Sequence, residues 1–198
     1  HSAEVAVSAA FGQSTRLRAT TIPLPPTRLS PAENLAWRRL PAQGRRRADW
    51  LLGRAALKLL MDGDDTSAVA FPHPHLSLSH SAGIAVAAGS VGNQAGLGVD
   101  FEGWRLTDPR TARFFLHDGE RVQDGELLRL WTVKEALFKA TPANAGGRLL
   151  DYRLTDPAAA VGTAVDVRGH AFRYVSGCLD GSGPLAVAIC AGSADAPV

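Results

Sequence analysis

Two short segments of the chain carry charged residues at spacings that suit metal and phosphate chemistry. In the first, residues 97–102 (LGVDFE), apolar and polar residues alternate as in a β-strand, with Asp100 and Glu102 two residues apart. Side chains at that spacing project from one face of a strand, about 6–7 Å apart along it. Mg²⁺ is typically held by one or two carboxylates, while phosphates and water complete its shell. The pattern therefore predicts either a metal site or a strand with a solvated polar face.

The second segment, residues 127–140 (LLRLWTVKEALFKA), has the periodicity of an amphipathic helix. Lys134 falls within the apolar arc of this helix, Glu135 falls at its border, and Lys139 follows Glu135 one turn later. A lysine at a core-facing position costs desolvation free energy unless an anion meets it. Only three of the 21 basic residues are lysines, and two of them lie here. The alternative is an ordinary helix on which Glu135 and Lys139 form a solvated ion pair.

Helix and strand signals surround both segments. Ser30, Pro31 and Glu33 predict a helix start, with Ser30 as the N-cap and Glu33 closing a capping box. A second helix is expected over about 45–61, and its first turns are crowded with arginines, which oppose the helix macrodipole unless an anion binds there. His80 is expected in a turn over 79–83. Strands are expected over 5–10, 76–78, 84–88, 151–156 and 161–191, with a hairpin near 180–183.

Length and composition limit the class of protein. With 198 residues and 45% hydrophobic content, the chain can bury a full core, either as one domain or as two small subdomains. Charged residues make up 20% and the net charge is +2, which excludes a disordered polyelectrolyte and does not by itself indicate nucleic acid. Two cysteines fit a reducing cytoplasm, and no apolar run reaches the length of a membrane span. We expect a cytoplasmic protein that binds neither nucleic acid nor membrane.

Considered together, the two segments resemble the paired signature of a known enzyme family. Residues 98–102 (GVDFE) and 131–140 (WTVKEALFKA), about thirty residues apart, resemble the 4′-phosphopantetheinyl transferases, and most closely the larger, surfactin-synthetase-activating (Sfp-type) subclass. The resemblance extends to the serine–histidine–serine segment at 79–81 and to the arginine-rich helix at 45–60. It covers residues from about 30 to 140.

This resemblance implies a fold and a reaction. The fold would be α+β, with two similar, pseudo-repeated subdomains over 3–92 and 93–198 and the active site between them. The reaction would move the 4′-phosphopantetheine arm of coenzyme A to a serine of an apo acyl or peptidyl carrier protein and release 3′,5′-ADP. Such an enzyme activates polyketide, non-ribosomal peptide or fatty-acid synthases. Mg²⁺, or Mn²⁺ in its place, would be the metal, and the protein would be a monomer.

The same resemblance assigns roles to individual residues. The metal would be bound by Asp100, Glu102 and Glu135. Coenzyme A would be contacted by Arg47, Arg54, Ser79 and His80, and its phosphates by Lys134 or Lys139. Catalysis would involve Glu120, Glu135 and Lys139, with Glu120 as the acceptor of the serine proton. The stretch from Glu120 to Glu135 is shorter than in the best-known members, so the sequence leaves the range of carrier proteins open.

Three other interpretations remain open at this stage. The smaller carrier-protein synthase subclass builds a related site between the subunits of a trimer, but its chains are much shorter. A magnesium-dependent nucleotide phosphohydrolase would use the same carboxylates and lysines on a phosphate. A non-enzymatic module would use the basic helix to bind acidic carrier proteins.

Overall fold

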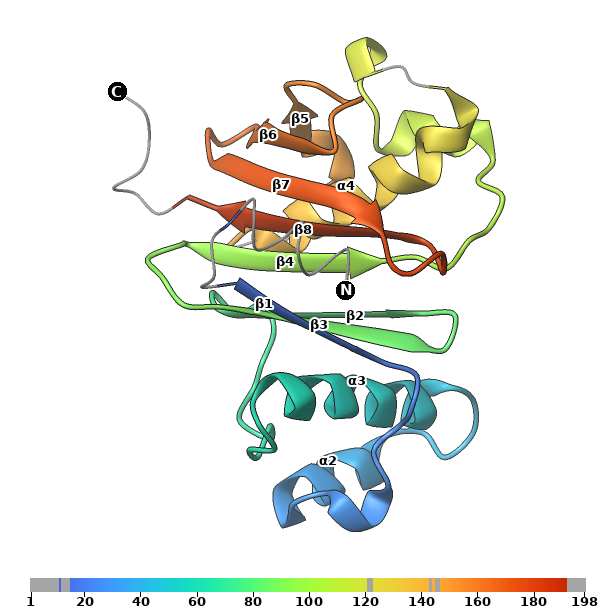
Figure 1. Cartoon of the computed structure of the whole chain (residues 1–198), viewed down its shortest axis with the longest axis vertical. Coiled ribbons are helices and arrows are strands. Elements are labelled where there is room, and N and C mark those ends of the chain that lie inside the picture. Colours follow the sequence, from blue (N-terminus) through green and yellow to red (C-terminus); the bar gives the residue numbers. More distant parts are fainter. Residues whose placement is uncertain (1–10, 12–14, 121–122, 143, 145–146, 192–198) are drawn as a thin grey trace.

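The computed structural model of the chain describes residues 11, 15–120, 123–142, 144 and 147–191. Two antiparallel sheets lie next to each other, and a long helix packs against each of them (Figure 1). The strands of the first sheet end at Ser90, and those of the second begin at Gly96. The α+β class predicted from the sequence is confirmed.

The first sheet has the strand order β1-β3-β2 and is covered by the helix α3. Buried leucines and alanines of α3 pack against Ala85 and Ala87 of β3. In chain order its elements are β1 (Thr15–Thr20), the 3-10 helix η1 (Pro26–Arg28), α2 (Pro31–Arg39), α3 (Arg46–Leu60), β2 (Leu76–Ser81) and β3 (Ile84–Ser90).

The second sheet has the strand order β4-β8-β7-β6-β5, and α4 lies across one face of it. Large aromatic side chains, Tyr152, Phe172 and Tyr174, fill the core between this face and the helix. Its elements are β4 (Gly96–Phe101), the 3-10 helices η2 (Pro109–Phe114), η3 (Asp118–Glu120) and η4 (Asp124–Glu126), α4 (Leu127–Ala140), η5 (Leu149–Asp151), β5 (Tyr152–Leu154), β6 (Val161–Asp166), β7 (Ala171–Cys178) and β8 (Pro184–Cys190).

Strand β4 connects the two halves because its alternate residues face different cores. Leu97, Val99 and Phe101 pack with Leu17 and Val86 of the first sheet. The residues between them face α4 instead, as the alternation in the sequence predicts. The chemistry-bearing residues of β4 therefore lie at the junction of the two sheets.

A buried carboxylate holds α2 and α3 together. The capping box of α2 is formed as predicted, with Ser30 Oγ accepting from Glu33 N and Glu33 Oε2 accepting from Ser30 N. Glu33 Oε1 accepts from the backbone N and the hydroxyl of Thr66 and lies 3.1 Å from Lys58 Nζ. Burial raises the pKa of Glu33, but the hydrogen bonds from Thr66, Ser30 and Lys58 outweigh it and lower the pKa to about 2.

Most of the expected elements form, with some differences. The helix over 127–140 is confirmed, and β4 is shifted by one residue from the predicted strand. His80 is part of strand β2 rather than of a turn, because Ala82 and Gly83, with φ of 50° and 77°, make the turn by themselves. The strand expected over 5–10 lies outside the described residues.

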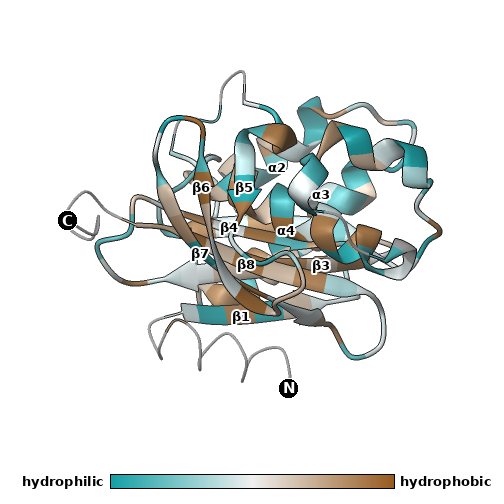
Figure 2. Ribbon diagram, turned by 90° about the horizontal axis from the view of Figure 1, so that it is seen from above, coloured by the Kyte–Doolittle hydropathy of each residue, from teal (hydrophilic) through white to brown (hydrophobic). Residues whose placement is uncertain are grey.

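Hydrophobic residues concentrate along the strands, and hydrophilic residues occupy much of the outer surface of the helices (Figure 2). Within the described part of the chain, no helix is both long and apolar enough to cross a membrane.

Candidate active site at the junction of the two sheets

Two glycines of β4 allow α4 to approach the strand closely. A Cβ atom at Gly96 would lie 2.0 Å from the carbonyl oxygen of Ala140, and one at Gly98 would lie 1.9 Å from that of Ala136. No side chain fits in either place, so the helix backbone rests directly on the strand. This contact brings Glu135 and Lys139, the neighbours of those alanines, next to the carboxylates of β4.

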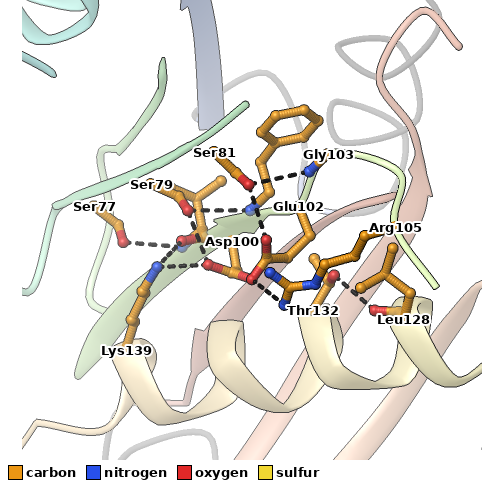
Figure 3. A network of polar contacts seen from close by, with 12 residues as sticks. Ser77, Ser79, Ser81, Asp100, Glu102, Gly103, Arg105, Leu128, Thr132 and Lys139 are labelled. Carbon is orange, nitrogen blue, oxygen red and sulfur yellow. Dashed lines mark hydrogen bonds and ion pairs between the residues drawn. The ribbon is translucent and has the colours of Figure 1, made fainter. Parts of the chain in front are cut away.

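Asp100 is the centre of this arrangement. It is 5% exposed, and its Oδ1 accepts hydrogen bonds from Ser79 Oγ at 2.8 Å and from Lys139 Nζ at 2.7 Å (Figure 3). Its Oδ2 is buried and has no hydrogen-bond partner among the described residues. A buried carboxylate oxygen without a partner is costly in free energy. A cation bound at Oδ2 would remove that cost.

Glu102 lies next to Asp100 on the same face of the strand (Figure 3). Its Oε2 accepts a hydrogen bond from Ser81 Oγ at 2.9 Å, and its Oε1 lies 3.1 Å from Arg105 Nη2. The Arg105 side chain is 53% exposed, so it holds the carboxylate only loosely in place. Asp100 on β4 and Glu102 just after it thus project on one side, as the sequence predicted, and the structure shows that this side faces α4.

Glu135 adds a third negative charge. Burial raises the pKa of Glu135, the charges of Asp100 and Glu102 raise it further, and Lys139 opposes the rise. Lys139 and the more exposed Arg105 therefore face three carboxylates, so one negative charge is left without a cationic partner when all three are ionised.

The donors present fit a hard divalent cation in part. Among the described residues, no group of three or more His, Cys, Asp or Glu side chains forms a metal-binding cluster. Mg²⁺, however, needs only one or two protein carboxylates. The unpartnered Oδ2 of Asp100, with Glu102 and Glu135 close by, meets that requirement.

Glu120 and Lys134 lie elsewhere, and here the structure differs from the roles suggested by sequence. Lys134 Nζ lies 2.9 and 2.7 Å from the two carboxylate oxygens of Glu120, and Lys134 is completely buried. Glu120 is 2% exposed and also accepts hydrogen bonds from the backbone N of Leu154 and of His117. Burial lowers the pKa of Lys134, and its contact with Glu120 counteracts this. The pair is sealed in the core, so neither residue has access to a phosphate or a substrate hydroxyl.

Arg47 and Arg54 are likewise not brought to the carboxylates. Arg47 donates to the carbonyl oxygens of Leu40 and Arg38 at 3.1 and 3.0 Å, which fixes the turn between α2 and α3. Arg54 donates to the carbonyl and hydroxyl oxygens of Thr66. Both guanidinium groups also lie over tryptophan rings, at 5.1 and 4.8 Å from the ring centres. Their observed contacts stabilise the first half of the chain.

A pocket of about 380 Å³ borders the site at Lys139. Lys139 lines this pocket and also contacts Asp100, so it connects the two. His80 is exposed at its wall and lies on the opposite side of β2 from the serine hydroxyls. The other lining residues are Phe71, Pro72, His73, Leu76, Ser77, Leu78, Leu97 and Asn144. Two larger hollows, of about 740 and 720 Å³, contain none of the predicted site residues.

Sequence reasoning placed Ser79 against a ligand, and the structure places its hydroxyl against Asp100 instead. It missed the role of Ser81, which contacts Glu102 in the same way, and that of Arg105. A signal was present, because serines occupy the alternate positions 77, 79 and 81, and carboxylates occupy the alternate positions 100 and 102. Neither strand by itself reveals that they face each other.

No family model matches this chain, and no curated protein matches it at a significant level.

Proposed function

We propose that this protein is a phosphopantetheinyl transferase, which moves the 4′-phosphopantetheine arm of coenzyme A to a serine of an apo acyl or peptidyl carrier protein. The observation that carries the proposal is the buried, unpartnered Oδ2 of Asp100, which lies near Glu135 and is connected through Lys139 to a pocket. Carboxylates that can bind a divalent cation, next to a lysine that lines a pocket, are suited to a reaction at a pyrophosphate.

In this proposal Asp100 and Glu102 hold Mg²⁺ or Mn²⁺, and Glu135 lies beside it. When bound, the metal neutralises charge on the pyrophosphate of coenzyme A. Lys139 leaves Asp100 and pairs with a phosphate, for which a flexible ammonium group is suited. The pocket walls, including His80, receive the rest of the coenzyme.

The carrier serine must lose its proton during transfer. Glu120 is buried against Lys134, so we assign this proton to Glu135, the carboxylate of α4 that lies near Asp100 and Glu102. The two-sheet architecture is compatible with the pseudo-repeated subdomains implied by the family resemblance, and we propose residues 3–92 and 93–198 as those subdomains. We also propose that the protein acts as a cytoplasmic monomer.

The test is the intact mass of an apo carrier protein after incubation with this protein, coenzyme A and magnesium. We expect a gain of about 340 Da, the mass of the phosphopantetheine arm, and loss of the gain with EDTA. Asp100→Asn should abolish the gain, whereas Asp64→Asn, at an exposed carboxylate, should preserve it.

Other results would replace the proposal. Release of phosphate or AMP from coenzyme A without a carrier would indicate a phosphohydrolase. Tight binding of a carrier protein, with no mass gain and no dependence on magnesium or coenzyme A, would indicate a binding module.

A further inference from the structure

The neighbouring edge strands β2 and β4 belong to different sheets and are joined through serine side chains (Figure 3). Three serine hydroxyls of β2, two residues apart, accept hydrogen bonds from three backbone N–H groups that are also two residues apart, two of them in β4 and the third just after it. The pairs are Ser77 Oγ with Val99 N at 2.9 Å, Ser79 Oγ with Phe101 N at 3.2 Å, and Ser81 Oγ with Gly103 N at 3.2 Å. The hydroxyls thus take the place that carbonyl oxygens have in a β-ladder.

Two of these hydroxyls also donate to a carboxylate. Ser79 Oγ donates to Asp100 Oδ1 at 2.8 Å, and Ser81 Oγ donates to Glu102 Oε2 at 2.9 Å. A hydroxyl has a single proton, so its donation to the carboxylate leaves its lone pairs for the backbone N–H. Each of these two hydroxyls therefore makes two hydrogen bonds, one with a backbone N–H and one with a carboxylate, and the second fixes the orientation of that carboxylate.

Ser77 accepts the same kind of hydrogen bond from a backbone N–H, but within the described part of the chain it has no carboxylate to which its hydroxyl could donate in the same way. The β4 residue that corresponds to Asp100 and Glu102 in its register is Gly98, which has no side chain. Ser77 is buried to a similar degree as Ser79, at 3% and 6% exposure. Ser77 therefore serves as a control: its hydroxyl forms a hydrogen bond between the sheets but none with a carboxylate of the site.

We propose that Ser79 and Ser81 are positioning residues that orient Asp100 and Glu102 for a divalent cation, and that this role is separate from joining the sheets. The inference rests on the metal site of the proposed function. Ser79 and Lys139 both occupy Oδ1 of Asp100, so that Oδ2 is the oxygen presented to the cation. Groups that orient metal ligands in this way typically affect metal affinity by about 10- to 100-fold.

The experiment compares Ser77→Ala, Ser79→Ala and Ser81→Ala in the full chain, without coenzyme A or carrier protein. Mn²⁺ binding is measured by titration calorimetry and by electron paramagnetic resonance, and unfolding by urea titration. All three variants should lower the urea midpoint, because Ser77→Ala removes one hydrogen bond between the sheets and each of the other two removes two. Only Ser79→Ala and Ser81→Ala should weaken Mn²⁺ binding, by about 10-fold or more. Ser81→Thr, which keeps the hydroxyl, should bind Mn²⁺ nearly as tightly as the unmodified chain.

Several results would overturn the inference. One is equal Mn²⁺ affinity in all three alanine variants, and another is a loss in Ser77→Ala as large as in the other two. If an alanine variant does not fold, Ser79→Thr and Ser81→Thr take its place, and a 10-fold loss in both would contradict the role of the hydroxyl. Mn²⁺ binding with the expected serine dependence, but no labelled carrier, would refute the proposed transferase and leave the positioning role intact. Absence of Mn²⁺ binding to the unmodified chain would refute the positioning role.

Discussion

Helix α4 approaches β4 so closely at Gly98 that no side chain fits between them, and replacement of this glycine tests that approach directly. In Gly98→Ala the new Cβ would lie 1.9 Å from the carbonyl oxygen of Ala136 and 2.7 Å from the backbone N of Ala140. An ordinary contact begins at 3.4 Å, so helix and strand must separate by about 1.5 Å. The clash is between backbone atoms, which no change of rotamer relieves.

Two consequences follow from this separation. Overpacking typically costs about 1–3 kcal/mol, and here we expect the upper end of that range or more, since two backbones must move apart. The same separation would carry Lys139 and Glu135 of α4 away from Asp100, and a hydrogen bond of 2.7 Å between Lys139 and Asp100 would lengthen to about 4 Å at an unchanged lysine rotamer. Gly98→Ala should therefore lose stability, and it should lose Mn²⁺ affinity because Glu135 moves away from the other two carboxylates.

The control is Gly177→Ala on β7 of the same sheet, where a Cβ would meet no atom within 4 Å. It should change the free energy of unfolding by less than about 1 kcal/mol. Urea unfolding followed by tryptophan fluorescence gives both values, and Mn²⁺ titration gives the affinities. If Gly98→Ala were as stable as Gly177→Ala and bound Mn²⁺ equally well, the close approach of α4 to β4 would be wrong.

Two further predictions concern carboxylates. Glu135→Gln should raise the free energy of unfolding of the metal-free protein at pH 7 and weaken Mn²⁺ binding. The reason is that burial and Asp100 disfavour the charge of Glu135 until a cation is bound. A lower free energy of unfolding of the metal-free variant would contradict this. For Glu33, the folded-state pKa of about 2 lies below the ordinary value of 4.5, so its contribution to stability is present above pH 4.5 and is lost as the pH falls toward 2. At 1.36 kcal/mol per pKa unit this contribution is about 3 kcal/mol. Between pH 5 and pH 2, the free energy of unfolding measured in urea should therefore fall less in Glu33→Gln than in the unmodified chain. Equal falls in the two proteins would refute the assignment.

Local patterns predicted the elements of the site well because they depend only on neighbouring residues. The periodicity of residues 127–140 gave both ends of α4, and the position of Lys134 in the apolar arc agrees with its complete burial. The alternation in 97–102 likewise placed Asp100 and Glu102 on one face.

Partners distant in sequence could not be predicted in the same way. The anion that meets Lys134 is Glu120, which a short 3-10 helix places in the core, and no periodic pattern marks it. Arg47 and Arg54 were expected at a ligand, but the carbonyl groups that they bind belong to turns whose course the sequence does not specify. The facing of β2 and β4 is a tertiary contact between two sheets, so the partners of Ser79 and Ser81 emerged only from the fold.

In the ion pair between Lys139 and Asp100, the ammonium group of Lys139 is the counter-ion of the carboxylate, and a metal cation could take its place. A divalent cation that binds Asp100 competes with the ammonium group for the same carboxylate. The ammonium group is attached to α4 through a flexible four-carbon chain, and the Lys139 side chain is 28% exposed and lines the pocket. In the proposed function, arrival of the cation would therefore free a positive charge at the pocket wall, where an anionic ligand would bind. Because such coupling is reciprocal, we expect the cation and the anionic ligand to strengthen each other's binding, even if they do not touch.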